Sequence, residues 1–394
     1  MGLALGDDCA LALACGLRLW HSAEVHHYGH RFDRLEGLVY RALYRHLLSR
    51  ADAEWIHGVA VRSLAMTGNF SVSRALLRCL FAPRRLESLA VSAFGLRFAH
   101  PLGLAGGFDK DGVALHGLAA LGFSFIEVGT VTPQPQAGNA KPRLFRLLDD
   151  QALINRMGFP SSGMARVAHN LERRPALPLA ISLGKNKTTP LQDALQDYCA
   201  VLEYLYPYGD LFVVNISSPN TPELRRLQTA AHLAELLAGL RQALAAQGSA
   251  KPLLLKIAPD LSFEEIETIC ALALQHGVSG LIATNTTLER PSGLRSADAH
   301  QPGGLSGAPL RAKSTQIVRH IRAVTAGQLP VIGVGGVFSG ADIWEKLCAG
   351  AVLVQAYTGF IYEGLAFVRR AISQLQGIMR AEGVRDLGQV IGKG

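Results

Sequence analysis

The stretch Leu211-Phe-Val-Val-Asn-Ile-Ser-Ser-Pro-Asn220 carries the strongest signal in this chain, because it begins as a buried strand and ends in polar residues. Two other runs repeat the pattern, namely Pro252-Leu-Leu-Leu-Lys-Ile-Ala-Pro259 and Gly280-Leu-Ile-Ala-Thr-Asn-Thr-Thr287. Burying an unpaired amide, hydroxyl or ammonium group costs several kcal/mol. Polar side chains gathered at one end of a sheet therefore indicate a site for a polar ligand.

Around these runs, short apolar segments alternate with longer amphipathic ones, which is typical of strands followed by helices. Eight strands are predicted, at Pro101–Gly106, Phe123–Gly129, Leu179–Leu183, Leu211–Ser217, Leu253–Ala258, Gly280–Thr284, Pro330–Val334 and Val352–Tyr357. Helices are predicted between them, among others at Leu191–Tyr206, His232–Ala246, Ser262–His276 and Ala341–Ala349. Eight such units over roughly 280 residues predict an α/β fold, a (β/α)8 TIM barrel. A doubly wound open sheet is the alternative fold.

Glycines follow the last two predicted strands, in Gly333-Val-Gly-Gly336 and Tyr357-Thr-Gly359. Barrels of this kind bind ligands at the carboxyl ends of their strands, and phosphates often lie after strands seven and eight. Glycine allows backbone amides to approach phosphate oxygens closely. The sequence thus favours a phosphorylated ligand.

The segment before the barrel is rich in arginine and in apolar residues. Ten arginines lie between Arg31 and Arg85, and the whole chain of 394 residues has a net charge of +8. Two amphipathic helices are predicted, at Leu38–Arg50 and Ala53–Met66, followed by a small hairpin of Leu89–Val91 and Leu96–Phe98. The sequence leaves two alternatives for these helices: they pack on the barrel, or they face a membrane. Nucleic acid is not an expected partner, because no recognisable module for it is present.

The chain divides into four predicted parts. Residues 1–37 form an N-terminal extension, with disorder as one open alternative; residues 38–85 are helical, 86–382 form the barrel and 383–394 a tail. The apolar stretch from Cys9 to Leu17 is too short to span a bilayer and has an acidic flank that a secretory signal lacks. Six scattered cysteines without a C-x-x-C pair favour a reduced, intracellular protein.

Candidate site residues come from the polar ends of the strands and from two loops. Lys110 lies in Gly106-Gly-Phe-Asp-Lys-Asp-Gly112, and Asn155-Arg-Met-Gly-Phe159 ends a long excursion from Thr132. With the polar strand ends, they supply one cation and many neutral amides and hydroxyls, which suits a planar anionic molecule. No histidine lies at a strand end and no metal-ligand spacing is present, so Ser218 would act without a histidine. Thr221 is the hypothetical proton relay.

At this point the sequence closely resembles the quinone-dependent (class 2) dihydroorotate dehydrogenases, from about Leu38 to Ile378. Ten ordered motifs carry the resemblance: the Gly106 to Gly112 and Asn155 to Phe159 stretches above, Glu127-Val-Gly-Thr-Val-Thr-Pro, Lys141-Pro-Arg-Leu-Phe-Arg, Gly184-Lys-Asn-Lys, Asn215-Ile-Ser-Ser-Pro-Asn-Thr-Pro, Lys256-Ile-Ala-Pro-Asp-Leu, Ala283-Thr-Asn-Thr-Thr, Gly303-Gly-Leu-Ser-Gly and Gly333-Val-Gly-Gly.

The resemblance implies a flavoprotein of de novo pyrimidine synthesis that oxidises (S)-dihydroorotate to orotate with FMN. It implies that Ser218 is the catalytic base; the class using soluble acceptors has cysteine there. Implied substrate contacts are Lys110, Asn155, Arg156, Met157, Gly158, Phe159, Asn215, Asn220, Asn285 and Thr286. Implied FMN contacts are Gly106, Gly107, Phe108, Asp109, Lys110, Thr130, Ser182, Asn215, Lys256, Thr284, Gly307, Gly336, Tyr357 and Thr358. Lys256 would stabilise negative charge on the reduced flavin.

The resemblance further implies that the N-terminal helices form a tunnel for ubiquinone or menaquinone, with His57, Arg146 and Tyr357 near its inner end. It implies a peripheral protein on the cytoplasmic face of the inner membrane. Three residues depart from the family: Ser182 and Pro160 replace asparagines and Glu223 replaces glycine. Another FMN barrel, a dehydrogenase with a soluble acceptor and a non-enzymatic phosphate-binding or scaffold protein are the alternatives.

Overall fold

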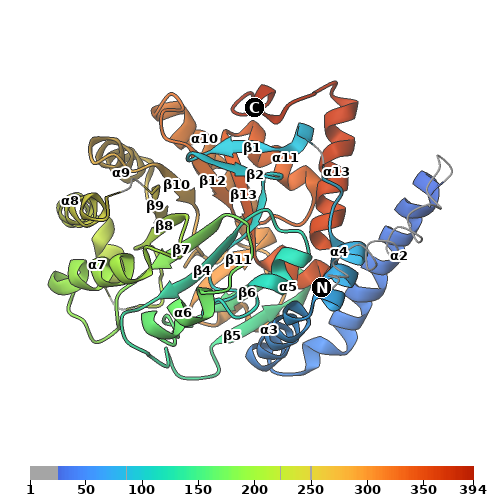
Figure 1. The fold of residues 1–394 in the computed structure, drawn as a ribbon, viewed down its shortest axis with the longest axis horizontal. Coiled ribbons are helices and arrows are strands. Elements are labelled where there is room, and N and C mark those ends of the chain that lie inside the picture. Colours follow the sequence, from blue (N-terminus) through green and yellow to red (C-terminus); the bar gives the residue numbers. More distant parts are fainter. Residues whose placement is uncertain (1–24, 86, 222, 249–250) are drawn as a thin grey trace, which may run out of the picture.

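Eight parallel strands close into a barrel in the computed structural model, which describes residues 25–85, 87–221, 223–248 and 251–394 (Figure 1). In chain order the strands are β3 (Leu102–Leu104), β4 (Ile126–Val131), β7 (Leu179–Leu183), β8 (Leu211–Asn215), β9 (Leu253–Ile257), β10 (Gly280–Ala283), β12 (Val331–Val334) and β13 (Ala351–Ala356). Each strand pairs with the next, and β13 pairs with β3 to close the ring. The predicted (β/α)8 barrel is confirmed, with all eight predicted strands present.

The strands are buried on both faces, as strands enclosed by an outer layer of helices must be. That outer layer consists of α5 (Leu115–Ala120), α6 (Met164–Leu171), α7 (Ala194–Leu205), α8 (Ala230–Ala246), α9 (Phe263–Gln275), α10 (Arg311–Val324), α11 (Gly340–Cys348) and α13 (Phe367–Ala381). The short helix α12 (Thr358–Glu363) follows β13. Ser262 and Glu265 form the predicted capping box at the start of α9.

A second sheet was not expected. It consists of β5 (Leu144–Leu147), β6 (Ala152–Asn155) and β11 (Gly304–Gly307), paired antiparallel with β6 in the centre. The first two strands form a hairpin inside the predicted long excursion, and β11 lies in the connection after β10. Apolar residues such as Ile154 and Leu305 give this sheet a small core of its own.

The hairpin before the barrel is formed by β1 (Val91–Ala93) and β2 (Leu96–Phe98), so its first strand begins two residues later than predicted. Its turn residues, Phe94 and Gly95, both have positive φ angles, of 54° and 71°. Such angles at both central residues match the twist of a two-residue hairpin. The buried Phe98 contacts Phe125 edge to face, with 5.3 Å between ring centroids.

Three α-helices of the described residues precede this hairpin, where two were predicted. They are α2 (Val25–His46), α3 (Ala53–Asn69) and α4 (Ser71–Phe81), with the short 3-10 helix η1 (Leu48–Arg50) after α2. The first helix thus begins within the predicted extension, whose residues 1–24 lie outside the described residues, and α4 was missed. In Figure 1 the three helices lie together on one side of the barrel, near α5 and α13.

Close contacts attach these helices to the barrel. A Cβ atom on Gly68 of α3 would lie 2.5 Å from the backbone nitrogen of Gly117 in α5, so the two helices approach at glycines. Tyr40 of α2 donates a hydrogen bond to the carbonyl of Ile361 (2.9 Å), and Arg41 pairs with Glu363 (2.8 Å). Among the described residues, no helix has both the length and the apolar content to cross a bilayer.

Candidate active site

A large cavity lies where the barrel strands end, enclosed by the strand-end loops, the second sheet and α3. It contains about 1250 Å³ of empty space, part of it open to solvent. A concave site lined by apolar side chains and a few convergent polar groups is the usual kind of site for a small ligand or cofactor. The second sheet contributes Leu144, Leu153 and Ser306 to its wall, and α3 contributes Glu54.

Most of the predicted site residues line this one cavity. They are Gly106, Gly107, Lys110, Thr130, Asn155, Met157, Gly158, Phe159, Asn215, Ser218, Asn220, Lys256, Thr284, Asn285, Thr286, Gly307, Gly336, Tyr357 and Thr358, together with His57 of the predicted tunnel. The carboxyl ends of parallel strands meet at one mouth, which is why residues so distant in sequence converge.

Five predicted residues do not line the cavity, and two of these support residues that do. Ser182 is fully buried behind Thr130, and their hydroxyl oxygens are 3.0 Å apart. The Asp109 carboxylate accepts hydrogen bonds from the backbone amides of Val113 (3.0 Å) and Ala114 (2.7 Å). Their contacts with FMN stay predictions, and in the structure both side chains fix loops that carry lining residues.

The other three lie around the rim. Arg156 points away, because it donates to Gln301 Oε1 (3.1 Å) and its guanidinium lies 4.6 Å from the centre of the Phe145 ring. Arg146 donates to the backbone carbonyl of Ala51 (2.7 Å) in the link between η1 and α3. Phe108 packs edge to face on His57, with ring centroids 4.8 Å apart. These side chains shape the site without facing its interior.

Neutral amides and hydroxyls form a connected network on the cavity floor. Asn215 Nδ2 donates to Thr130 Oγ1 (2.7 Å), while Asn285 Nδ2 donates to Asn215 Oδ1 (3.2 Å) and to Ser217 Oγ (3.0 Å). Asn220 Nδ2 donates to Asn155 Oδ1 (3.1 Å). Each amide is thus held in one orientation, which gives the floor a fixed pattern of donors and acceptors.

Ser218 presents its hydroxyl to the cavity from the loop after β8. Its oxygen accepts a hydrogen bond from the backbone amide of Asn220 (3.3 Å). Thr221 Oγ1 is buried and has no hydrogen-bond partner among the described residues, so no direct bond joins it to Ser218. The neighbouring Glu223 has a positive φ of 53°, the left-handed region that the family's customary glycine adopts without strain.

Lys110 is a cation without a hydrogen-bonded partner among the described residues. Its ammonium lines the cavity, and burial lowers its pKa more strongly than the nearby carboxylates of Glu54 and Asp111 raise it. A desolvated ammonium is stabilised by any anion that enters. The position therefore favours an anionic ligand directly beside Lys110.

Lys256 has a partner that the sequence analysis missed. Its ammonium lies 3.0 Å from Glu127 Oε1, and the Glu127 carboxylate also accepts a hydrogen bond from Gln355 Nε2 (2.9 Å). Glu127 is completely buried, and a Cβ on Gly106 would collide with its carboxylate. The sequence did contain a signal for this pair: Glu127 lies inside a predicted apolar strand, and a buried charge needs a partner.

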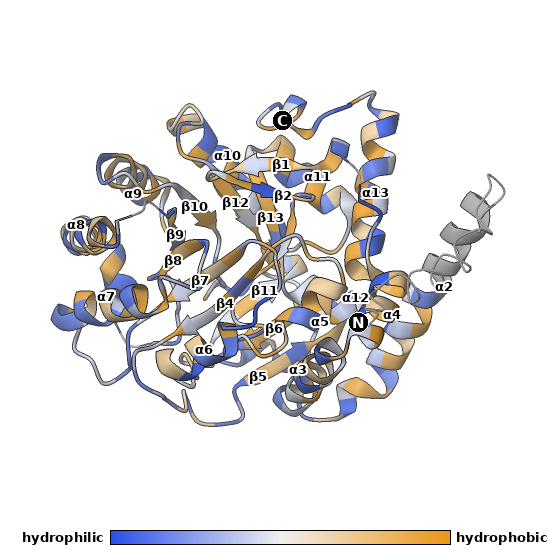
Figure 2. Ribbon diagram, viewed as in Figure 1, coloured by the Kyte–Doolittle hydropathy of each residue, from blue (hydrophilic) through white to orange (hydrophobic). Residues whose placement is uncertain are grey.

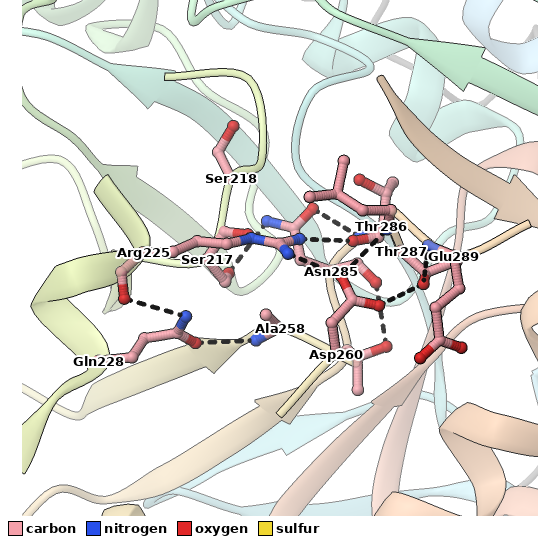
Figure 3. Close-up of polar contacts among 12 residues, drawn as sticks. Ser217, Ser218, Arg225, Gln228, Ala258, Asp260, Asn285, Thr286, Thr287 and Glu289 are labelled. Atoms are coloured by element: carbon pink, nitrogen blue, oxygen red, sulfur yellow. Dashed lines mark hydrogen bonds and ion pairs between the residues drawn. The ribbon is translucent and has the colours of Figure 1, made fainter. Parts of the chain in front are cut away.

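Arg225 joins three of the strand-end loops, and it too was missed. Its guanidinium donates to the backbone carbonyls of Ser217 (3.1 Å) and Thr286 (3.0 Å) and to the carboxylate of Asp260 (2.7 Å). Figure 3 shows the Arg225 side chain between the loop of Ser217 and the loop of Thr286, and the Ser218 side chain points away from Arg225. The bonds fix the loop of Ser218 relative to the loop of Asn285.

Two residues close the cavity on the side of α3. His57 Nε2 lies 2.9 Å from the carbonyl of Phe108, which can only accept, so this nitrogen carries the proton. Burial lowers the pKa of His57 to about 3, so the ring is neutral at physiological pH. Tyr357 packs against Phe108 with 5.8 Å between ring centroids, and burial raises its pKa. Both of these rings are therefore uncharged.

The glycine loop after β12 has unpaired backbone donors. Gly335, Gly336 and Val337 line the cavity, and their N–H groups form no hydrogen bond to a described residue. Gly335 and Gly336 have positive φ angles, of 122° and 69°, and a Cβ on Gly336 would lie 2.4 Å from the Cβ of Arg311. Adjacent free amides of this kind suit an anion such as phosphate.

Comparisons with known proteins agree with one another. The family model described as dihydroorotate dehydrogenase matches residues 88–379. The dihydroorotate dehydrogenase (quinone) of Gloeobacter violaceus is 50% identical over 358 residues, covering 90% of this chain and 98% of its relative. That of Acaryochloris marina is 46% identical over 375 residues, covering 91% and 98%.

The solved structures include the crystal structure of DHODH in complex with ferulenol from Eimeria tenella. It matches with a TM-score of 0.83 and 36% sequence identity, over 90% of this chain and 98% of that one. The family model spans the whole barrel, and the curated relatives and the solved structure cover about nine tenths of the chain. The chain belongs to the dihydroorotate dehydrogenase family.

Proposed function

We propose that this enzyme oxidises (S)-dihydroorotate to orotate in pyrimidine biosynthesis and passes the electrons through FMN to a membrane quinone. The observation that supports it best is one cavity in which Lys110, Ser218 and the amide network surround the same space, beside a loop with free amides. Curated relatives of high identity are named dihydroorotate dehydrogenase (quinone).

The substrate is a six-membered ring with a carboxylate, two carbonyls and two ring N–H groups, and its ring becomes planar on oxidation. Lys110 would bind the carboxylate, because it is the cation with a free hydrogen-bonding capacity in the cavity wall described above. Asn155, Asn220 and Asn285 would bind the ring, and their mutual hydrogen bonds already orient them. The Asn155 to Phe159 stretch closes over the substrate, with Met157, Gly158 and Phe159 in the wall.

FMN fits the remaining residues. The free amides of Gly335, Gly336 and Val337 suit its phosphate, and Gly106 lets the backbone of the cavity wall pass close to Glu127, where a Cβ would collide with the carboxylate. When bound, FMN supplies an acceptor for the hydride that leaves C6 of the substrate. Thr130, Asn215, Lys256, Thr284, Gly307 and Thr358 would contact it, with Tyr357 at its edge.

Ser218 would remove the proton from C5 of the substrate. Its hydroxyl faces the cavity and the Asn220 amide occupies one of its lone pairs, which orients the other toward the substrate. A serine base must pass its own proton onward. Thr221 Oγ1, buried and without a described partner, is the acceptor we propose through a bridging water.

The pairing of Lys256 with Glu127 changes the role predicted for that lysine. The pair is neutral as a whole, so Lys256 does not bring an uncompensated charge to the cofactor. We propose that Glu127 and Gln355 hold the ammonium in place, at the edge of the cavity where negative charge develops.

The quinone would enter between α2, α3 and α4. His57 and Tyr357 form the inner end of its path, with Arg146 fixing the link between η1 and α3. Figure 2 shows hydrophobic residues along the ribbons of these helices. Large apolar side chains are exposed on α3 and α4 and between them, among them Trp55, Phe70 and Val72. They would insert into the surface of the membrane, which we propose to be the cytoplasmic face of the inner membrane.

One experiment tests both the oxidation of dihydroorotate and the role of Ser218 as the base. Purified protein is mixed anaerobically with dihydroorotate, and flavin bleaching is followed by stopped flow. We expect bleaching in the wild type and a rate about 10²- to 10⁴-fold lower in Ser218→Ala, the usual value of a positioned base. Ser279→Ala, at the opposite end of the barrel, is the matched control.

Two results would contradict the proposal. Absence of bleaching in a flavin-containing wild type would exclude dihydroorotate as the reductant. A wild-type rate in Ser218→Ala would show that another group takes the proton, while the activity itself would stand.

A further inference from the structure

Lys346 of α11 is a completely buried lysine that the proposed reaction does not use. Its ammonium donates to Ser314 Oγ (2.6 Å) and Thr315 Oγ1 (3.2 Å), both on α10. No carboxylate of the described residues lies within ion-pair distance of it, because the nearby Asp342 pairs with Arg311 (2.9 Å). Burying a cation without a counter-ion is costly, so its position calls for an explanation.

The hydrogen bonds of Lys346 lead to the glycine loop. Ser314 Oγ, which accepts from Lys346, can donate to the carbonyl of Gly335 (3.2 Å) or to that of Arg311 (3.1 Å). The Gly335 carbonyl belongs to the same peptide group as the N–H of Gly336, which lines the cavity. A chain of donors thus runs from a buried ammonium through one hydroxyl to one peptide group.

Arg311 donates a hydrogen bond to the carbonyl of the next peptide group in the glycine loop. Its Nε donates to the carbonyl of Gly336 (2.9 Å), which shares a peptide group with the N–H of Val337. Hydrogen bonds in series polarise one another, so a donor on the carbonyl side strengthens the N–H on the other side. The two cations lie behind the loop, and the free amides lie on its cavity face.

We infer that Lys346 and Arg311 form a cationic support behind the glycine loop, which increases the affinity of the Gly336 and Val337 amides for a phosphate monoester. This rests on the proposed binding of FMN, whose phosphate is the ligand concerned. The net charge of Lys346, Arg311 and Asp342 is +1, so the phosphate would supply the missing counter-charge across the loop. Burial lowers the pKa of Lys346 to about 8, which leaves it protonated at pH 7.

Riboflavin separates this role from a structural one, because it is FMN without the phosphate. The full chain, stripped of flavin, is titrated at pH 7 with FMN and with riboflavin, and quenching of flavin fluorescence gives both affinities. In Lys346→Met we expect the affinity for FMN to fall about tenfold, the effect of one charge at intermediate range in partly desolvated protein. Riboflavin affinity should not change.

Two further variants complete the design. Arg311→Gln removes the second charge at a position that is partly exposed, so it remains informative if Lys346→Met does not fold. Lys251→Met is the control: Lys251 also donates to backbone carbonyls, those of Tyr206 (2.6 Å) and Gly209 (2.8 Å), but at the other end of the barrel. It should leave the ratio of FMN to riboflavin affinity unchanged.

Each outcome bears on the inference. A selective loss of FMN affinity in Lys346→Met or Arg311→Gln supports it. An equal loss for both flavins would mean that the residues only hold the fold, and no loss at all would mean that the charges do not act on the loop; either result overturns it. A wild type that binds neither flavin would refute the proposed function and this inference together.

Discussion

The barrel and the three helices α2, α3 and α4 use apolar residues in opposite ways. Inside the barrel, strands such as β4 and β8 bury every residue. In the described part of the chain, ten of the seventeen exposed large hydrophobic residues lie between Leu38 and Leu80, and α4 buries none of its residues. An apolar surface of this size on a folded protein indicates a partner. These exposed residues are therefore the basis of the membrane contact that we propose for the three helices.

The same division separates the two half-reactions that we propose. The reducing substrate would meet residues of the barrel loops, such as Ser218 and Lys110, which are held by the amide network and by Arg225. The quinone would meet the side of the cavity formed by His57 and Tyr357. Because the two sides have different supports, changes in one region should affect one half-reaction only.

The largest effect is expected from removing the helices. A chain of residues 86–394 should lose quinone reduction entirely, because the walls of the quinone path are gone. It should still reduce its flavin with dihydroorotate, since Lys110, Ser218 and the asparagines all lie in the barrel. Both rates are measured on the same preparation, so flavin bleaching serves as the control for folding. Quinone turnover by the truncated chain would refute the proposed path.

The apolar surface itself can be tested with two pairs of residues of the same types. Val72→Ser with Leu76→Ser removes exposed residues of α4, whose side chains are 75% and 58% exposed. We expect binding to anionic phospholipid vesicles to weaken by about a hundredfold, at roughly 1.5 kcal/mol for each side chain inserted. Vesicle flotation measures it.

Val324→Ser with Leu274→Ser is the matched control, because these residues are 43% and 40% exposed on the barrel helices α10 and α9. Vesicle binding should remain at the wild-type level in this variant. Equal weakening in both variants would mean that the membrane does not distinguish the two regions.

The smallest effect concerns the acid stability of the barrel. Burial lowers the pKa of His100 to about 4, from a usual value of 6.5, while its Nε2 lies 2.8 Å from the carbonyl of Gly122. Below pH 6.5 the unfolded chain binds a proton that the folded chain does not, so stability falls as the pH decreases toward 4. The loss at pH 5.5 relative to pH 7 should be about 1.4 kcal/mol.

Urea unfolding of the wild type and of His100→Gln at both pH values measures this pH-dependent loss of stability, because glutamine at position 100 cannot bind a proton. The free energy of unfolding should fall more steeply with acid in the wild type. Equal slopes would show that His100 is protonated in the folded state as readily as in the unfolded one.

The sequence predicted the barrel well because each of its strands is a continuous apolar run and each helix has its own amphipathic period. The second sheet was missed, since β6 pairs with β11 across about 150 residues, and such a pairing leaves no local signal in the sequence. Helix α4 was missed for a local reason: Phe70 at its N-cap makes no side-chain cap, so no signal marks its start.

For the site, the sequence by itself determined which polar residues end the strands, because parallel strands bring those ends to one mouth whatever the details of packing. Only the tertiary structure decided what each of these residues contacts. Glu127 pairs with Lys256 at a separation of 129 residues, Arg225 bridges three loops, and Ser182 lies behind Thr130. Such contacts depend on distances between side chains of different strands, which are fixed by the closure and register of the barrel and leave no periodic trace in the chain.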